Sequence, residues 1–319
     1  MKTKQFNPWR APLDPNTPIL RAALEQLEYQ HRAVQYWLRR ACRTDRDDVH
    51  AIHQLRVWIR RTLATLALYD PILPPKQTAK TERLLRRIAR SARQVRDADV
   101  LLARLTSWPA SKYLDVWIKA LRKDRNDHRI SFLKDCEEWV GQRKLQRRAR
   151  RLLKHAAKHE AEDVAEAIVP PTDAPFASWA SQRFLTWIED YCQQAPPIDD
   201  MKRLHAFRLR GKQLRYAMEH LSGLFPKFFR TRLYARLQKQ QQRLGEVNDL
   251  YSLLPLLQRR VEESANLREA ETWGPLFYEE QHNLQRALRR TAGWLTNDGL
   301  LELRNEFREA MRGNFDAVD

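Results

Sequence analysis

The chain has 319 residues, of which 43% are apolar and 31% are charged, so it can form one large or two medium domains with a real core. The formal net charge of +18 favours polyanionic partners such as nucleic acid, anionic lipid or polyphosphate. The N-terminus lacks an apolar signal core, and no run of about 18 apolar residues occurs, which argues against a membrane span and favours the cytoplasm.

The first half of the chain predicts four long helices. Only 8 glycines occur in the chain, and apolar residues recur at spacings of three and four, which indicates an all-helical protein. We expect helices over residues 18–42, 47–69, 76–105 and 111–139. Asn16 and Thr17 are candidate caps for the first helix, because Pro18 suits a first helical position.

A strongly basic stretch follows, and we expect it to form an exposed helical arm or connector. It occupies residues 141–158, and Pro170 and Pro171 then mark a boundary. Four more helices are expected over residues 176–193, 200–224, 229–261 and 265–293, followed by a short one over 298–311. The sequence therefore predicts one domain over residues 16–312, with repeat one at 16–140, a basic connector at 141–169 and repeat two at 170–312. Each repeat is expected to form a four-helix bundle of antiparallel neighbours.

Two further residue types are best explained by packing. The three cysteines, Cys42, Cys136 and Cys192, are widely spaced and include no CxxC pair, so we expect buried thiols in a reducing compartment and no disulfide or zinc site. The tryptophans occur at helical core spacing, which favours core packing over base stacking.

An internal repeat is the strongest signal in the sequence. His53, Arg56 and Arg60 lie on one face of a helix, and His205, Arg208 and Lys212 repeat that pattern with an offset of 152 residues. In the second copy Arg215 extends the ladder by one turn, whereas the first copy has Leu63 at the matching position. Such a line of cations suits a linear polyanion, because neighbouring side chains can each take a different phosphate. The alternative is a helix face that simply points at water.

The helix that follows each ladder adds further candidates. In the first half these are Arg83, Arg86, Arg90 and Arg93, which form one stripe with Asp97. Arg87 and Arg96 flank this stripe, and Arg61 follows Arg60 on the ladder helix. If this stripe faces the ladder, up to seven cations line one groove. In the second half the candidates are Lys239, Arg243 and Asp249, and they are sparser. Asp97 and Asp249 are matched, and we expect each to hold an arginine in place.

The two histidines leave several roles open. His53 and His205 are candidates for anion contacts, for buried core positions or for phosphate-accepting nucleophiles. A competing enzyme hypothesis makes Asp97 and Asp99 metal ligands for phosphate hydrolysis, but the second half has Tyr251 where Asp99 would match. No Gly-rich phosphate loop and no other catalytic motif supports catalysis, so we predict a non-enzymatic protein without metal or cofactor.

These residues resemble the CHAD family, the conserved histidine α-helical domains. The likeness rests on an ordered set of segments: residues 49–61, with His53, Arg56 and Arg60; residues 95–102, with Asp97 and Asp99; residues 204–219, with His205, Arg208, Lys212 and Arg215; and residues 237–250, with Asp249. The resemblance implies two helical bundles related by a pseudo-twofold axis, with a basic central groove that binds inorganic polyphosphate, and association with polyphosphate granules. The chain resembles a stand-alone CHAD protein, without a CYTH triphosphatase domain. The main alternative function is sequence-nonspecific nucleic-acid binding, which would share the charge and the salt dependence.

Overall fold

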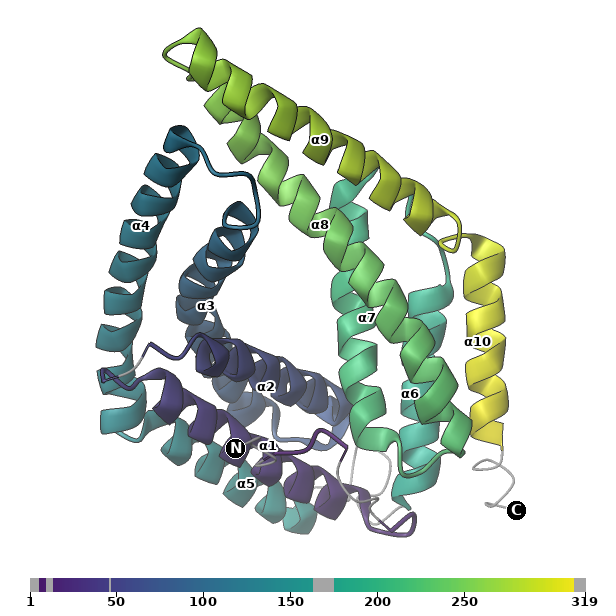
Figure 1. Ribbon diagram of the computed structural model, residues 1–319. Helices are drawn as coiled ribbons and strands as arrows, with labels where there is room; N and C mark the ends of the chain where they lie inside the picture. The colour runs from purple at the N-terminus through teal and green to yellow at the C-terminus, as the bar shows by residue number, and fades with distance from the viewer. Residues whose placement is uncertain (1–5, 10–13, 46, 163–174, 313–319) are drawn as a thin grey trace. The chain divides into compact units, whose positions relative to one another are not determined.

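The computed structural model is all-helical, as the sequence predicts. The structure describes residues 6–9, 14–45, 47–162 and 175–312, with the side chains of 159–162 excepted, and within these ranges it has ten α-helices and no strand (Figure 1). The first five are α1 (Ile19–Ala41), α2 (Val49–Leu68), α3 (Pro75–Leu105), α4 (Lys112–Cys136) and α5 (Lys144–Glu162). The others are α6 (Phe176–Cys192), α7 (Met201–Leu221), α8 (Tyr234–Glu262), α9 (Leu267–Ala292) and α10 (Asn297–Met311). Short 3-10 or π segments lie at η1 (Asp70–Ile72), η2 (Glu137–Gly141) and η3 (Phe229–Leu233). No helix in the described part of the chain is both long and apolar enough to cross a bilayer.

Local sequence signals explain where the ladder helices start. The side chain of Asp48 accepts a hydrogen bond from the backbone N–H of Ala51 (2.9 Å), and Asp200 accepts one from Arg203 (2.9 Å). Each carboxylate satisfies a backbone donor that would otherwise be left unpaired at the helix start. Asp48 and Asp200 are separated by the same 152 residues as the two ladders. The expected caps of α1 are wrong, because Pro18 occupies its N-cap and no side chain caps the helix.

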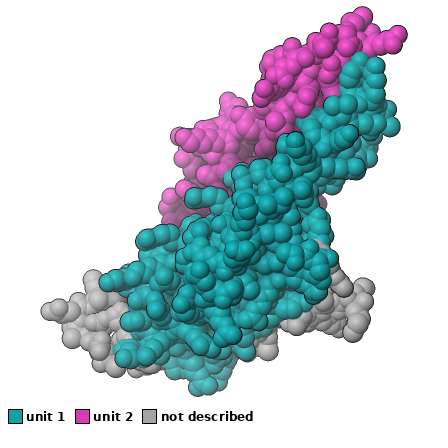
Figure 2. Space-filling model, turned by 90° about the vertical axis from the view of Figure 1, so that its left-hand side faces the viewer, with its two compact units in different colours: residues 1–179 teal, residues 180–319 magenta. Residues whose placement is uncertain are grey.

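The chain divides into two compact units, residues 1–179 and 180–319 (Figure 2). In the first unit α2 and α5 each pack against both α1 and α3, while α4 packs along α3. The fourth helix of this bundle is therefore α5 and not α4. The predicted boundary at Pro170 and Pro171 lies outside the described residues. In the second unit α8 packs against α7 and α9, and α10 contacts η3.

The basic stretch was predicted to be an exposed helical arm or connector, but the structure packs it into the first bundle. It forms α5, whose inner face buries Leu145, Ala149, Leu152 and Ala156. These residues recur every three or four positions, so they form one apolar stripe that packs against α1 and α3. The apolar stripe is hard to recognise in the sequence, because nearly half of the residues of this segment are cationic.

The structure also corrects the prediction for the cysteines. Cys42 and Cys136 form a disulfide with a Cα–Cα distance of 5.8 Å, which links the end of α1 to the end of α4. Cys192 is a buried thiol, as expected. The pairing was not visible in the sequence, because the two cysteines are 94 residues apart and are brought together only by helix packing. The tryptophan prediction is confirmed for Trp37 and Trp58, which are 4% and 3% exposed.

Candidate functional site

The ladder on α2 faces α3. Arg56 sits on the inner side of α2, and its Nη1 donates a hydrogen bond to the backbone carbonyl of Ala89 on α3 (2.9 Å). This bond places the Arg56 guanidinium between the two helices, where it is only partly exposed. The two helices therefore bring the cations of α2 and α3 together, as the sequence analysis expected.

The electrostatics at this contact show an excess of positive charge. The pKa of Arg56 is lowered to about 10, first by burial and then by repulsion from Arg60, with smaller contributions from Arg93 and Arg96. The pKa of His53 is lowered to about 4, first by burial, then by Arg96 and by other cations around it. A depressed pKa on a cationic group means that its charged form is disfavoured where it lies. Asp97 opposes part of this repulsion at Arg56, but the net shift of both pKa values is downwards.

The partners of these cations confirm the imbalance. Arg93 Nε lies 2.9 Å from Asp97 Oδ2, so Asp97 holds an arginine as predicted, although both side chains are exposed. Among the described residues, no carboxylate forms an ion pair with Arg60 or Arg96. We define the α2–α3 cationic cluster as the set His53, Arg56, Arg60, Arg93 and Arg96.

Other predicted cations of the first half lie outside this cluster. Arg61 stacks on the ring of Trp58 at 4.8 Å, and Arg87 pairs with Glu138 at 2.6 Å beside Trp139. Successive residues of a helix point in different directions, so these two side chains do not join the cluster. The expectation that the ladder and the α3 stripe line one groove with up to seven cations stays a prediction. The exposed stripe further along α3 contains Arg83, Arg86 and Arg90, of which Arg86 pairs with Glu82 at 3.3 Å.

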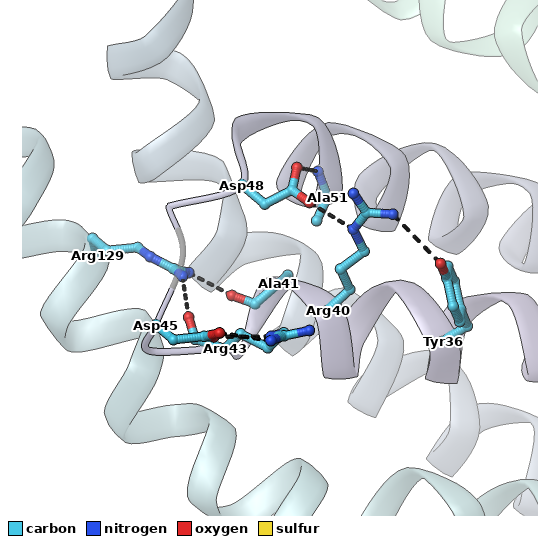
Figure 3. A network of polar contacts seen from close by, with 8 residues as sticks. All are labelled: Tyr36, Arg40, Ala41, Arg43, Asp45, Asp48, Ala51 and Arg129. Atoms are coloured by element: carbon cyan, nitrogen blue, oxygen red, sulfur yellow. Dashed lines mark hydrogen bonds and ion pairs between the residues drawn. The ribbon is translucent and has the colours of Figure 1, made fainter. Parts of the chain in front are cut away.

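The start of α2 is held by a polar network around the α1–α2 turn (Figure 3). Asp48 accepts from Arg40 Nε at 2.6 Å as well as capping α2, and Arg129 on α4 donates to the backbone carbonyls of Ala41 and Arg43 at 2.5 and 2.9 Å. The disulfide joins the same turn to the end of α4. These contacts determine where α2 begins and so position its ladder. The contacts of Arg129 are not visible in the sequence, because its partners are more than 80 residues away.

A further histidine, His50, lies beside the α2–α3 cationic cluster and was not among the predicted site residues. It lies one turn before His53, and its charge contributes to lowering the pKa of His53. Its ring packs edge-on against Trp37, with centroids 5.5 Å apart. The signal was present in the sequence as a second histidine three residues before the ladder.

The second unit carries a weaker version of the same contact. His205 Nδ1 and Asn248 Oδ1 lie 2.6 Å apart, which joins α7 to α8. Asn248 matches Arg96 at the offset of 152, so a neutral amide lies beside the histidine here, whereas in the first unit the cation Arg96 lowers the pKa of His53. Arg208 lies over Gly245, with Nη2 3.7 Å from the position that a Cβ would occupy. Gly245 stands where the first half has Arg93, so one repelling cation is missing.

Arg215 belongs to an internal network and is neutralised there. Its Nη1 lies 3.3 Å from Glu219 Oε1 and donates to the hydroxyl of Tyr234 at 2.6 Å. The Tyr234 hydroxyl in turn donates to Glu219 at 2.7 Å. Glu219 is 3% exposed, so this ion pair is buried. The expectation that Arg215 is an anion contact is therefore not supported by its surroundings.

The remaining candidates of the second unit differ in their surroundings. Lys212 is partly exposed on α7, Lys239 is exposed on α8, and Arg243 is partly exposed there. Asp249 is exposed, and no described cation pairs with it; it accepts a hydrogen bond from Asn248 at 3.3 Å. The prediction that each aspartate holds an arginine is therefore correct for Asp97 and wrong for Asp249. That the two ladders line one shared central groove stays a prediction.

Asp97 and Asp99 do not form a metal site. Asp97 is exposed and bound to Arg93, whereas Asp99 is buried and accepts from Arg125 Nε at 2.7 Å. Residues two apart on a helix point to nearly opposite sides, so the two carboxylates do not face one point. Among the described residues, no group of three or more His, Cys, Asp or Glu side chains is arranged to hold a metal ion. This removes the ligand set of the hydrolase hypothesis.

Comparison with known proteins identifies the family. The CHAD domain matches residues 20–258 of the sequence. The chain belongs to the CHAD family. The CHAD domain from the plant Ricinus communis has a similar structure, with a TM-score of 0.65 and 21% identity over 95% of this chain and 97% of that one. PptA from Streptomyces chartreusis has a TM-score of 0.55 and 18% identity over 87% of this chain and 99% of that one. No curated protein sequence matches the chain.

The CHAD match covers both ladders and so includes the residues described above. At these identities the two solved structures support the all-helical fold of this CHAD chain and nothing finer. Within the CHAD match, the α2–α3 cationic cluster is where burial and neighbouring cations lower the pKa values of two predicted site residues, Arg56 and His53.

Proposed function

We propose that this CHAD protein binds inorganic polyphosphate and that the α2–α3 cationic cluster is its principal anchor. One observation carries the proposal: two helices bring four guanidinium groups and a histidine together, and the pKa values of Arg56 and His53 are both depressed there. A bound polyanion would relieve that repulsion, because its phosphates supply the negative charge that the surrounding protein lacks. The CHAD family membership supports polyphosphate as the polymer.

The proposed mechanism is replacement of counterions along the polymer. Guanidinium groups take phosphate oxygens in pairs, and each contact releases a condensed cation to bulk solvent. Affinity should therefore fall steeply as salt rises. The ladder of the second unit, with Arg208 and Lys212, would add a weaker contact, so long polymers that reach both ladders should bind more tightly than short ones. Arg215 is not part of this mechanism.

We propose binding without chemical turnover, in the cytoplasm and at polyphosphate granules. The Cys42–Cys136 disulfide removes the support that cysteine usage had lent to a reducing compartment, so the location now depends on the proposed partner. A metal-dependent hydrolase lacks its expected ligand pair, since Asp99 is bound to Arg125. Release of phosphate from polyphosphate in the presence of magnesium or manganese would refute binding without turnover.

The proposal is tested by removing two cations that have no acidic partner. The variant Arg60→Gln with Arg96→Gln should weaken polyphosphate binding by at least tenfold and reduce the slope of log affinity against log salt by about 1–2. The matched control is Lys119→Gln with Arg122→Gln on α4, where both side chains are exposed and the same charge is lost. Binding is measured by titration at two salt concentrations, with circular dichroism as the check on folding.

Competition distinguishes polyphosphate from nucleic acid. Duplex DNA at a matched concentration of phosphate should displace long polyphosphate only weakly. Easy displacement would favour nonspecific nucleic-acid binding instead. Equal losses in the Arg60/Arg96 variant and the α4 control would show that net charge, and not the α2–α3 cationic cluster, determines affinity.

A further inference from the structure

A second cationic surface lies on α5, outside the residues already discussed. The outer face of this helix presents exposed cations, Arg147, Arg150, Arg151, Lys154 and Lys158, and the exposed Arg143 directly precedes the helix. No described carboxylate forms an ion pair with any of them. Lys144 is excluded from the stripe, because it pairs with Glu138. We call these six residues the α5 stripe.

The α5 stripe faces away from the bundle. It lies opposite Leu145, Ala149, Leu152 and Ala156, which pack against α1 and α3. The same two helices also pack against α2, which lies on a different side of them from α5. The α5 stripe is therefore a separate surface from the α2–α3 cationic cluster. From Arg147 to Lys158 it extends about 16 Å along the helix.

The charges of the stripe act against the helix that carries them. No acidic residue stands in the first turn of α5, although that end of a helix favours negative charge. Arg147 and Arg151, and likewise Arg150 and Lys154, are like charges at a spacing of four, which destabilises a helix. The buried apolar face offsets these costs. A bound polyanion would remove the repulsion along the whole stripe at once.

We infer that the α5 stripe is a second docking surface for a linear phosphate polymer, so that the first unit holds long polyphosphate at two separate places. This rests on the proposed function and extends it from one anchor to two. Every turn of the helix from Arg147 to Lys158 places at least one cation on this face, which suits a chain of phosphates lying along the helix. The distance around the bundle means that only a long polymer can occupy both surfaces.

The composition of the stripe favours a bare phosphate polymer over other polyanions. No aromatic side chain stands among the six cations, so the stripe offers no surface on which bases could stack. It also lacks the exposed large apolar residues with which an amphipathic helix enters a bilayer, because its leucines face the bundle core. The stripe can recognise charge along a line and little else.

The test separates the two surfaces by polymer length. The variant Arg147→Gln, Arg150→Gln, Arg151→Gln and Lys154→Gln removes four cations of the stripe and keeps good helix formers. The control replaces the exposed α4 residues Lys119, Arg122, Lys123 and Lys134 by Gln, which lowers the net charge equally. The full-length chain and both variants are titrated with tripolyphosphate and with long-chain polyphosphate over a series of salt concentrations.

We expect the stripe variant to bind tripolyphosphate within twofold of the parent chain, since the α2–α3 cationic cluster is intact. Its slope of log affinity against log salt for long polyphosphate should fall by about 2–3, and the slope of the control by less than 1. The inference is overturned if the stripe variant and the control change alike. It is also overturned if the stripe variant loses affinity for duplex DNA or phosphatidylglycerol vesicles but not for long polyphosphate. Failure of the parent chain to bind either phosphate polymer would instead reject the proposed function.

Discussion

The buried ion pair of the second unit allows a sharp test of which arginines bind polyphosphate. Arg215, Glu219 and Tyr234 contact one another in a network in which Glu219 is 3% exposed. The first half has Leu63 and Ala67 at the positions that match Arg215 and Glu219, so the chain itself supplies an apolar replacement for the pair. The double variant Arg215→Leu with Glu219→Ala transfers that replacement to the second unit and leaves the net charge unchanged.

The structure determines the expected free energies of unfolding. Arg215→Leu leaves the Glu219 carboxylate buried without its cation and should lower the free energy of unfolding by about 3 kcal/mol. Glu219→Ala should cost about 2 kcal/mol, because the Arg215 side chain is 19% exposed and can turn partly towards water. The double variant should cost only about 2 kcal/mol, mainly from lost packing. The coupling energy between the two residues is then about 3 kcal/mol.

The assay is urea unfolding of the parent chain, both single variants and the double variant, followed by circular dichroism. Titration with long polyphosphate on the same four proteins gives the functional readout. Because Arg215 is already neutralised, the double variant should keep its affinity within about twofold. Additive single costs would show that the ion pair is not buried as described, and a tenfold loss of affinity in the double variant would show that Arg215 binds the polymer.

Two further predictions follow from His53 and the disulfide. The pKa of His53 is lowered to about 4, so between about pH 6.5 and pH 4 the unfolded chain binds more protons than the folded chain. The stability that depends on neutral His53 is therefore present above about pH 6.5 and is lost as the pH falls to about 4. His53→Gln should flatten the dependence of the free energy of unfolding on pH, as measured by urea unfolding. Bound polyphosphate should raise the pKa of His53, so affinity should rise on acidification more in the parent chain than in the variant. An equal pH response of the two affinities would place His53 away from the polymer. Replacing Cys42 and Cys136 by Ser should lower the free energy of unfolding by about 4 kcal/mol, because the disulfide closes a loop over 94 residues. Dithiothreitol should have the same effect on the parent chain and none on the variant, and an unchanged parent midpoint would show that the disulfide does not form.

The sequence by itself determined the helices and the repeat of the ladders. Helix positions follow from local rules, namely the spacing of apolar residues, carboxylate caps such as Asp48 and Asp200, and the scarcity of glycine. The ladder residues share a helix face for the same local reason. These features depend on neighbours within a few residues, so they could be predicted from the sequence alone, and the family could be recognised from them.

Only the tertiary structure decided which charges stay uncompensated. Arg125 is bound by Asp47 and Asp99, which are 78 and 26 residues away, and Arg236 on α8 by Glu302 and Glu306 on α10. The local pattern of charges cannot show such pairs, because long-range packing chooses the partner of each side chain. The same packing turned the basic connector into a bundle helix and joined two distant cysteines. The net positive charge belongs to the sequence, but its concentration at the α2–α3 cationic cluster results from the distance between helices and the exclusion of water between them.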